Sequence, residues 1–451
     1  MKIVGIVAEY NPFHNGHAYQ LNRARASYGP DVPVVAVMSG DFVQRGEPAI
    51  ADKRVRTEAA LRCGVDLVIE IPFTFACASA ERFAQGAIRL LNATGIVTDL
   101  YFGSECDDLA LLCCVAEEYD EENPEYIASL REYLREGKAY AKARELAVGD
   151  FLRRSGRVDL ADASAQIMSK PNSILALEYL IALRKTGSKI RPSALRREGA
   201  GYNECSIDSP FSSATGIRNA VDRHTSTGNF RVSDIAADLI GKMPDISLAL
   251  LLSAWQGGIR PVTPRLFIGE QILRIRALPP EELEKYAYMG DNLSRHLRNA
   301  VSRLRDTDPD HLLDAFREES DTRRFAPTRV FRAMTSMLTG QLDKDLSALT
   351  EPKYLRVLGF SDVGRNLLRI MRKSAILPIV DKASDFLSFG GDPALSRMAE
   401  LDLLSADLWG LKAGLRYGIE FERTVIRLTA RETRDRSGET TGLSGSGRQS
   451  L

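Results

Sequence analysis

Short apolar segments alternate with amphipathic ones along the first hundred residues of the chain. Four apolar, β-branched runs predict buried strands over residues 3–8, 32–38, 67–71 and 98–102. Helical patterns lie between them, and the one that Ser79 can cap carries its apolar residues on a single face. This alternation predicts an α/β fold with a doubly wound parallel sheet, which binds ligands at the carboxyl ends of its strands.

The remaining chain is dominated by helical patterns. Residues 109–183 are mainly helical, and residues 189–193 are expected to return as a further strand. From about residue 243 the pattern is again mostly helical, with proline-containing breaks. We therefore predict an α/β domain over residues 1–235, a mostly helical domain over residues 236–430, and a disordered tail over residues 431–451, which has no aromatic residue to build a core.

Composition limits the classes of function without selecting one. The 451 residues include 60 basic and 60 acidic side chains, so a nucleic-acid partner would have to meet basic residues gathered on one face. The six cysteines contain no C-x-x-C pair and the five histidines are scattered, so we expect reduced thiols and no metal site. The chain contains no run of about 18 apolar residues and no signal-peptide pattern, so we expect a cytoplasmic protein without a membrane partner.

The sharpest candidate for chemistry directly follows the first predicted strand. Residues 11–17 place His14 and His17 on either side of Gly16, where a helix is expected to begin. A helix N-terminus offers N–H groups and a positive dipole end to phosphate, glycine lets the backbone approach a ligand, and histidines can donate hydrogen bonds to phosphate oxygens. The pattern favours phosphoryl or nucleotidyl transfer. The alternative is that the two histidines only cap the helix.

A second segment follows the same logic. Residues 212–218 place serine and threonine hydroxyls at the start of another helix, ahead of Arg218. Together with H-x-G-H at residues 14–17, this segment resembles the two phosphate-binding signatures of the nucleotidyltransferase superfamily. That resemblance implies attack on the α-phosphate of ATP with release of pyrophosphate. Taken alone, residues 212–218 can equally be an ordinary capped helix.

Four longer segments resemble one family of that superfamily. Residues 7–17, 38–48, 102–105 and 354–360 are similar to the corresponding parts of the tRNA(Met) cytidine acetate ligase family. The resemblance implies that acetate and ATP form acetyl-adenylate, which then acetylates the 4-amino group of the wobble cytidine in elongator tRNA(Met). It also implies ATP as a substrate, Mg²⁺ arriving with ATP, and tRNA as the partner.

The resemblance assigns roles to particular positions. The residues that it implies for ATP binding are Val7, Ala8, Glu9, Tyr10, Asn11, Pro12, Phe13, His14, Asn15, Gly16, His17, Ala18, Tyr19, Gln20, Gly103, Asn172 and Arg197. As catalytic residues we expect His14 and His17, together with Asp41 and Lys53. Asp41 can orient the acceptor amine or accept its proton, and Lys53 can neutralise phosphate or bind the carboxylate. A solvated loop and a surface lysine are the alternatives for these two, while Glu105 is either a base or a cap of the next helix along the chain.

Basic residues in the C-terminal half are candidates for RNA contact. Those that we expect to bind RNA are Arg329, Arg332, Arg356, Arg365 and Arg369. Arg365, Arg369 and Arg372 recur at intervals of four and three residues, so they share one helical face. Aromatic neighbours can stack an exposed base beside them. The alternative is solvated surface, and RNA contact is implied mainly by the resemblance.

Two rival functions stay open at this point. The chain can be an adenylyltransferase that acts on a small phosphorylated metabolite, or a nucleotide-gated RNA-binding protein without catalysis. The roughly 200 residues beyond the α/β part exceed what the first rival needs. The oligomeric state and the acceptor of the amine proton are also open.

Overall fold

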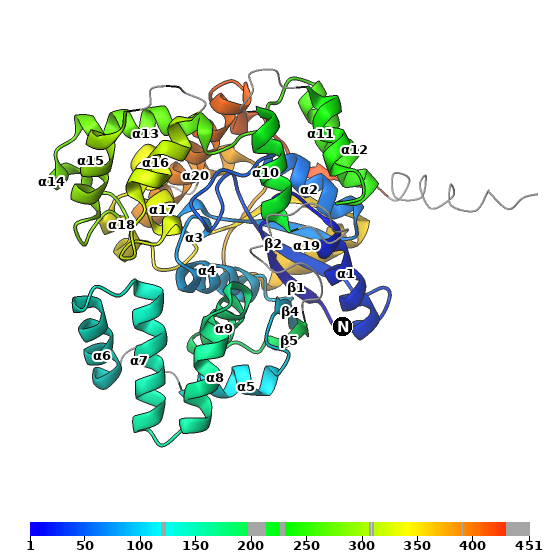
Figure 1. Ribbon diagram of the computed structural model, residues 1–451. Coiled ribbons are helices and arrows are strands. Elements are labelled where there is room, and N and C mark those ends of the chain that lie inside the picture. The colour runs from blue at the N-terminus through cyan, green and yellow to red at the C-terminus, as the bar shows by residue number, and fades with distance from the viewer. Residues whose placement is uncertain are drawn as a thin grey trace, which may run out of the picture.

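The computed structural model describes residues 1–118, 123–196, 213–225, 231–305, 308, 311–388 and 391–429. At its centre lies an eight-stranded sheet with strand order β5-β4-β1-β2-β3-β6-β7, in which β8 also pairs with β6 (Figure 1). The strands are β1 (Val4–Ala8), β2 (Val34–Ser39), β3 (Leu67–Ile71), β4 (Asp99–Ser104), β5 (Arg191–Arg196), β6 (Leu355–Phe360), β7 (Ile379–Val380) and β8 (Ile426–Arg427).

The N-terminal strands form the parallel part of the sheet, as the sequence predicts. β1 pairs with β2 and β4, β2 pairs with β3, and β4 pairs with β5, all in parallel. Between them lie α1 (Asn15–Tyr28), α2 (Lys53–Arg62), the short α3 (Phe73–Ala76) and α4 (Ala80–Ala93). Asp52 and Ser79 cap α2 and α4 by accepting the backbone N–H groups of Arg54 and Arg82. The predicted fold class is therefore confirmed.

The C-terminal half contributes strands to the same sheet, which its helical pattern does not predict. β6 lies antiparallel to β3, and its outer edge is paired by β7 along its first residues and by β8 along its last ones. Periodicity alone does not distinguish a short apolar run from a buried helical turn. Residues 355–360 form a strand because they pair with the edge of β3. The boundary near residue 235 stays a prediction, and the sheet contains strands from both sides of it.

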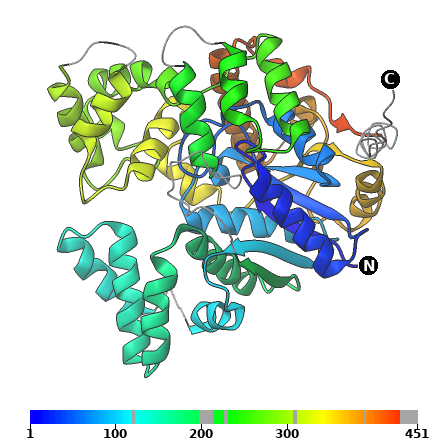
Figure 2. The ribbon, with the colours of Figure 1, turned by 45° about the vertical axis from the view of Figure 1, so that its right-hand side comes forward.

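Two groups of helices project on the side of the sheet away from α1 (Figures 1 and 2). The first group comprises α5 (Leu109–Glu118), α6 (Pro124–Arg135), α7 (Tyr140–Arg154), α8 (Val158–Met168) and α9 (Pro171–Lys185). The second group comprises α13 (Arg265–Ala277), α14 (Pro280–Leu283), α15 (Leu293–Arg303), α16 (Leu312–Ser320), α17 (Pro327–Thr339) and α18 (Asp343–Ala348). Packing of α9 on α4 ties the first group to the sheet.

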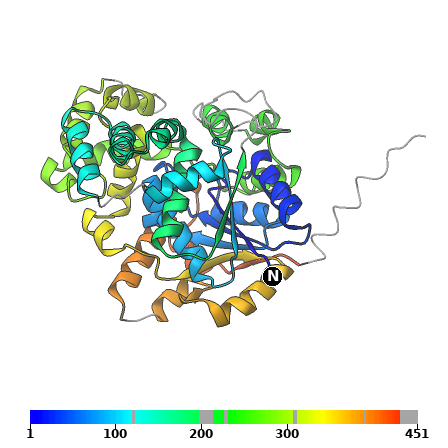
Figure 3. The ribbon, with the colours of Figure 1, turned by 90° about the horizontal axis from the view of Figure 1, so that it is seen from below.

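The other C-terminal helices lie against the sheet domain itself. They are α10 (Ala214–Thr225), α11 (Val232–Leu239), α12 (Asp245–Gln256), α19 (Asp362–Ser374) and α20 (Pro393–Ala413), with the 3₁₀ helices η1 (Ala383–Ser388) and η2 (Ile419–Phe421). Seen from below, α19 lies beside the sheet near the N-terminus (Figure 3). Among the described residues, none of these helices is long and apolar enough to cross a membrane.

Side chains of β2 show how the core is divided. Val35 and Val37 belong to the larger apolar cluster, whereas Val34, Ala36 and Met38 belong to a second cluster. Alternate residues of a strand point to opposite faces, so the sheet is buried on both sides, as its unbroken apolar runs predict. Because both faces of the sheet are covered, the polar loops lie at the carboxyl ends of the parallel strands.

Candidate active site

The loop between β1 and α1 presents two stacked imidazole rings. His14 is the N-cap of α1, and its Nδ1 accepts the backbone N–H of Gly16 at 3.0 Å. The Nδ1 of His17 accepts the backbone N–H of His14 at 3.2 Å. The ring centroids lie 3.9 Å apart and the planes are inclined by 32°. Because each Nδ1 is an acceptor, the neutral rings carry their proton on Nε2, which makes each ring a donor at the helix N-terminus.

Gly16 makes room for this arrangement. A Cβ at position 16 would lie 2.8 Å from Cε1 of His14, so any other residue would displace the ring. His14 is 5% exposed and His17 is half-buried. The histidines do cap the helix, and the capping hydrogen bonds are accepted by Nδ1. A hydrogen bond to phosphate would come from Nε2 of the same rings, so the two interpretations of the sequence are compatible.

The C-terminal half holds this loop in place. The buried Ser247 hydroxyl, on α12, donates to the carbonyl of Phe13 at 2.8 Å. The backbone N–H of Asn15 donates to the carbonyl of Lys242 at 3.2 Å, and its Nδ2 donates to the carbonyl of Gly241 at 2.8 Å. Hydrogen bonds from residues more than 200 positions away thus fix the backbone that orients both imidazoles.

Arg218, on α10, brings the second signature to the same loop. Its Nη1 donates to the carbonyl of Asn11 at 3.2 Å, and its Nη2 donates to the hydroxyl of Thr215 at 3.2 Å. The two segments that the sequence singles out are therefore adjacent in space, although Ser212 lies outside the described residues. Arg218 is absent from the predicted site residues, and the hydroxyl-rich turn before it is the signal that marks it.

Asp41 and Lys53 meet beyond the carboxyl end of β2, but inside the protein. The Nζ of Lys53 lies 3.1 Å from Oδ2 of Asp41, 2.9 Å from Oε1 of Glu70 and 3.1 Å from Oε2 of Glu420. All four residues are at most 3% exposed. The burial excludes the solvated loop and the surface lysine that the sequence left as alternatives. It also means that neither side chain reaches open surface.

Two arginines extend this ion cluster. Arg356, on β6, lies 3.1 Å from Oε2 of Glu70 and 2.6 Å from Oε2 of Glu420. Arg423 lies 2.9 Å from Oε1 of Glu420 and also contacts Asp52. Arg356 is 6% exposed, so this predicted RNA-binding residue instead neutralises carboxylates inside the fold. The prediction misplaced it because the segment was expected to be helical rather than a sheet strand.

Burial and pairing set the proton affinities of the cluster. Burial raises the pKa of Asp41 to about 6, although Lys53 opposes the shift. Burial would likewise raise the pKa of Glu420, but Lys53, Arg356 and Arg423 lower it to about 2. Burial would lower the pKa of Lys53, but the surrounding carboxylates raise it above its ordinary value. Lys53 therefore stays protonated, whereas Asp41 exchanges its proton closer to neutral pH.

Arg56 fixes the edge of the sheet at which these groups lie. It is 1% exposed, and it donates to the carbonyls of Glu9 at 2.8 Å and Ser39 at 3.0 Å, and to that of Gly40. Glu9 follows β1 and Ser39 ends β2, so one guanidinium clamps the carboxyl ends of both strands. The sequence gives no signal for Arg56, because an arginine within a helix is usually solvated.

Gly103 and Asn172 lie at the carboxyl end of β4, farther along the same edge of the sheet. Gly103 is part of β4, where it pairs with β5. Oε1 of Glu105 accepts the backbone N–H of Asn172 at 3.3 Å and its Nδ2 at 2.6 Å, and Oε2 accepts the backbone N–H of Ser173 at 2.7 Å. Glu105 thus caps α9, whereas at α5, the next helix along the chain, Asp108 accepts the backbone N–H of Leu111. The contacts favour the role of a cap over that of a base, but on a different helix from the predicted one. Arg197 lies outside the described residues.

The other arginines predicted to bind RNA do not form one surface. Arg332 is 9% exposed and donates to the backbone of the loop after β2. Arg329 lies 2.8 Å from a carboxylate oxygen of Asp291. Arg365 and Arg369 are exposed on α19. Of the predicted set, these two have the exposure that contact with RNA requires.

Comparison with known proteins agrees with this geometry. The family model "HIGH Nucleotidyl Transferase" matches residues 1–416. A protein of Acetivibrio thermocellus named tRNA(Met) cytidine acetate ligase is 38% identical over 433 residues, covering 94% of this chain and 100% of that one. A protein of the same name from Caldanaerobacter subterraneus is 36% identical over 416 residues, covering 91% of this chain and 95% of that one.

Solved structures give the same result. The apo structure of Thermotoga maritima TmcAL has a TM-score of 0.85 and 32% sequence identity, over 95% of this chain and 100% of that chain. A second structure of that protein, bound with alpha-thio ATP, has a TM-score of 0.83 at the same identity and coverage. From the family model and these relatives together, the chain belongs to the tRNA(Met) cytidine acetate ligase family of HIGH nucleotidyltransferases.

Proposed function

We propose that this protein activates acetate with ATP and transfers the acetyl group to a cytidine of tRNA. Relatives named tRNA(Met) cytidine acetate ligase and a solved relative bound with an ATP analogue support the proposal. The observation that carries the chemistry is the stacked pair of His14 and His17 at the N-terminus of α1, whose Nδ1 atoms accept backbone N–H groups, so that each neutral ring carries its proton on Nε2. The proposed acceptor is the 4-amino group of the wobble cytidine in elongator tRNA(Met).

The first proposed step is attack by an acetate oxygen on the α-phosphate of ATP. A bond forms between this oxygen and the α-phosphorus, and the bond from that phosphorus to the oxygen that bridges it to the β-phosphate breaks. Pyrophosphate leaves, and acetyl-adenylate remains in the site. Negative charge grows on the non-bridging oxygens, where the Nε2–H groups of His14 and His17 and the N-terminus of α1 stabilise it. Positioning and charge stabilisation suffice for such a step, so the enzyme needs no covalent intermediate.

The edge of the sheet holds the rest of the nucleotide in this scheme. We assign ATP contacts to residues 7–20, Gly103 and Asn172. We add Arg218 as a phosphate ligand, and its hydrogen bond to the carbonyl of Asn11 supports this assignment. Arg197, which the family resemblance also implies, stays a prediction. In this proposal Mg²⁺ arrives with ATP, because it prefers phosphate oxygens and water as ligands.

The second proposed step is attack by the cytidine amine on the acetyl carbonyl carbon. The carbon–nitrogen bond forms, AMP leaves with one of the oxygens of acetate, and the amine loses a proton. An aromatic amine is a weak nucleophile, which is why an acyl-adenylate is a suitable donor. The wobble base has to be splayed from the anticodon stack to reach the site.

Asp41 and Lys53 act as positioning residues in this scheme. They face one another in the buried cluster rather than open surface. Their ion pairs hold the loop after β2 against α2 and against the C-terminal segment that carries Glu420. The cluster therefore shapes the rim against which acetate and cytidine dock, and the groups that touch the reacting atoms are His14 and His17.

Isotope-labelled acetate tests the proposal. Incubation of the protein with ATP, labelled acetate and total tRNA is expected to label one tRNA species. His17→Ala is expected to abolish the labelling, whereas His311→Ala, which changes an exposed histidine before α16, leaves it intact. Pyrophosphate release that depends on a phosphorylated metabolite instead of acetate would support the adenylyltransferase rival. Binding of RNA without any acetate-dependent turnover would support the non-catalytic one.

A further inference from the structure

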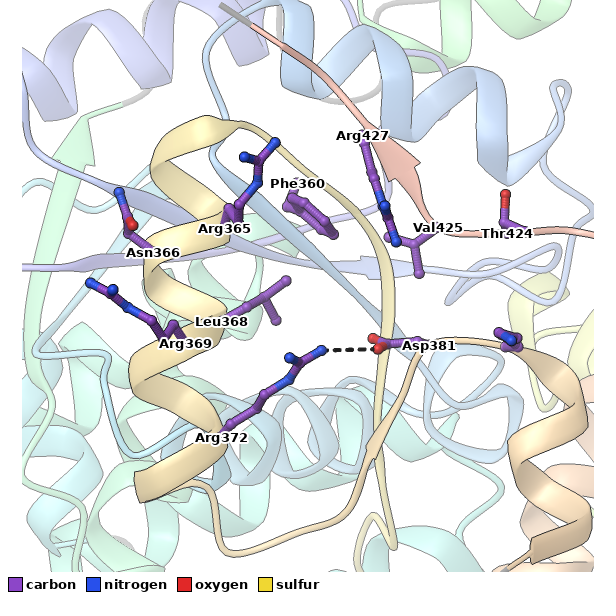
Figure 4. Close-up of a pocket in the computed structure, with 11 residues that line it drawn as sticks. Phe360, Arg365, Asn366, Leu368, Arg369, Arg372, Asp381, Thr424, Val425 and Arg427 are labelled. Carbon is purple, nitrogen blue, oxygen red and sulfur yellow. Dashed lines mark hydrogen bonds and ion pairs between the residues drawn. The ribbon is translucent and has the colours of Figure 1, made fainter.

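A pocket of about 430 Å³ lies at the outer edge of β6 (Figure 4). β7 pairs with the first two residues of β6 and β8 pairs with its last two, so the edge is open between these strands. α19 covers the opening from one side, and the segments that follow β7 and surround β8 form the other side. Phe360, Leu368 and Val425 contribute apolar contacts to the lining.

Basic side chains dominate this pocket. α19 contributes three of them, at intervals of four and three residues, and two more come from the segments across the opening. In Figure 4 the side chain of Arg372 points toward Asp381, whereas that of Arg369 leaves α19 on the other side. The five are Arg365, Arg369, Arg372, Lys382 and Arg427. Asp381 is the one carboxylate among the eleven lining residues. The pocket therefore has a strongly positive lining in a chain whose net charge is zero.

Carboxylates neutralise only part of this charge. Arg372 lies 3.4 Å from Asp381, and Arg365 lies 3.1 Å from Asp362, which precedes it on α19. Among the described residues, ion pairs are absent for Arg369, Lys382 and Arg427. The guanidinium of Arg427 lies 5.9 Å from the centroid of the Phe360 ring, which holds it at the mouth of the pocket. Several cations are thus available to an anionic partner.

The spacing of the cations favours a chain of phosphates over a single small anion. Three arginines at intervals of four and three residues extend over about 10 Å of helix, at about 1.5 Å per residue. Arg365 and Arg372, at the two ends of this row, have side chains that are 60% and 64% exposed. A single small anion is held by convergent buried donors, whereas a row of exposed arginines suits successive phosphodiesters. We propose that this pocket binds consecutive phosphates in the backbone of the substrate RNA.

The pocket is separate from the candidate active site. β2 and β3 lie between β1 and β6, so three strand spacings of about 4.8 Å place the pocket roughly 14 Å or more from the loop that carries His14 and His17. RNA bound at both places would contact the pocket several nucleotides from the reacting base. The identity of the RNA rests on the proposed function, but the contact itself does not. The pocket is expected to contribute to RNA affinity and not to acetate activation.

The salt dependence of tRNA binding tests this proposal. Bulk tRNA is titrated with the full-length protein over a range of KCl concentrations, because each phosphate contact adds about 0.7–0.9 to the slope of log Kd against log salt. Replacement of Arg365, Arg369 and Arg427 by alanine is expected to reduce the slope by about 2–3 and to weaken binding on the order of tenfold or more. Replacement of the same three residues by lysine is expected to preserve most of the slope.

A matched control removes the same charge elsewhere. Arg131, Arg135 and Lys138 are exposed on α6 and after it, in the other helical group, and their triple alanine variant is expected to leave the slope unchanged. Acetate-dependent exchange between ATP and pyrophosphate, measured without RNA, is expected to be the same in all variants. If the wild type lacks this exchange, the proposed function fails while the slopes still test the pocket.

Three results would overturn the proposal. The first is a pocket variant whose slope of log Kd against log salt equals that of the wild type. The second is an α6 control whose slope falls as much as that of the pocket variant. The third is a lysine variant whose slope falls as much as that of the alanine variant. A further arm uses inorganic phosphate alone. Thermal stabilisation of the wild type but not of the alanine variant by micromolar phosphate would assign the pocket to a small anion instead of RNA.

Discussion

Replacement of Lys53 by methionine removes the cation that three buried carboxylates contact. In the native cluster its Nζ lies 2.9–3.1 Å from oxygens of Asp41, Glu70 and Glu420. Methionine is a flexible, unbranched side chain of similar length, so packing changes little. Removal of one partner from a buried ion pair costs about 3–5 kcal/mol, because the charge left behind stays desolvated. Asp41 loses the most charge compensation, because Arg356 still contacts Glu70 and Arg423 still contacts Glu420.

The destabilisation depends on pH in a direction that the cluster determines. Burial already raises the pKa of Asp41 to about 6 in the presence of Lys53, and removal of Lys53 raises this pKa further. A carboxyl group whose pKa is higher in the folded protein binds more protons there, so its contribution to stability is lost as pH rises through the folded pKa. The loss of unfolding free energy in Lys53→Met is therefore largest above about pH 7 and becomes smaller as the pH falls toward 5.

Urea unfolding followed by tryptophan fluorescence measures this effect. With a denaturant slope of about 3 kcal/mol per molar urea, the midpoint is expected to fall by about 1–1.7 M at pH near 8 and by clearly less at pH near 5.5. Lys344→Met changes an exposed lysine on α18 and is expected to stay within about 0.5 kcal/mol of the wild type. A shift no larger than that of Lys344→Met, or the same deficit at both pH values, would refute the reasoning.

Three further substitutions probe the site. Gly16→Ala is expected to slow acetate-dependent pyrophosphate exchange about 10²-fold, because its Cβ would displace the ring of His14; a rate close to that of the wild type contradicts this. Arg218→Gln is expected to raise the KM for ATP about tenfold in initial-rate kinetics, since it loses a charged phosphate ligand; an unchanged KM would remove Arg218 from the site. Glu105→Gln is expected to lower the unfolding free energy by about 1–2 kcal/mol, because the carboxylate caps α9; an unchanged urea midpoint would show that this cap is dispensable.

Local rules account for the part of the fold that the sequence predicts correctly. Residues 67–71 form β3 without any shift, and α2 and α4 begin after the predicted caps Asp52 and Ser79. Each of these features depends on apolar periodicity or on one polar side chain next to the helix that it caps. The loop with His14 and His17 was predictable for the same reason, because it directly follows a recognisable strand.

Contacts between distant segments account for what the sequence does not predict. Arg423 contacts Asp52 across 371 positions, and Arg356 becomes buried only because β6 pairs with β3. No periodicity within either segment carries that information, so Arg356 resembles a surface arginine in the sequence. The two roles of His14 are likewise alternatives in the sequence, because only the geometry of the ring shows that Nδ1 is the nitrogen that caps the helix.

Acetate labelled with ¹⁸O at both oxygens tests most directly whether the reaction passes through the α-phosphate. The labelled acetate is supplied with ATP and tRNA, and the products are analysed by mass spectrometry. Attack at the α-phosphate predicts AMP that carries one labelled oxygen, acetylated tRNA that keeps the other, and unlabelled pyrophosphate. Labelled inorganic phosphate together with ADP, or AMP without label, would contradict it.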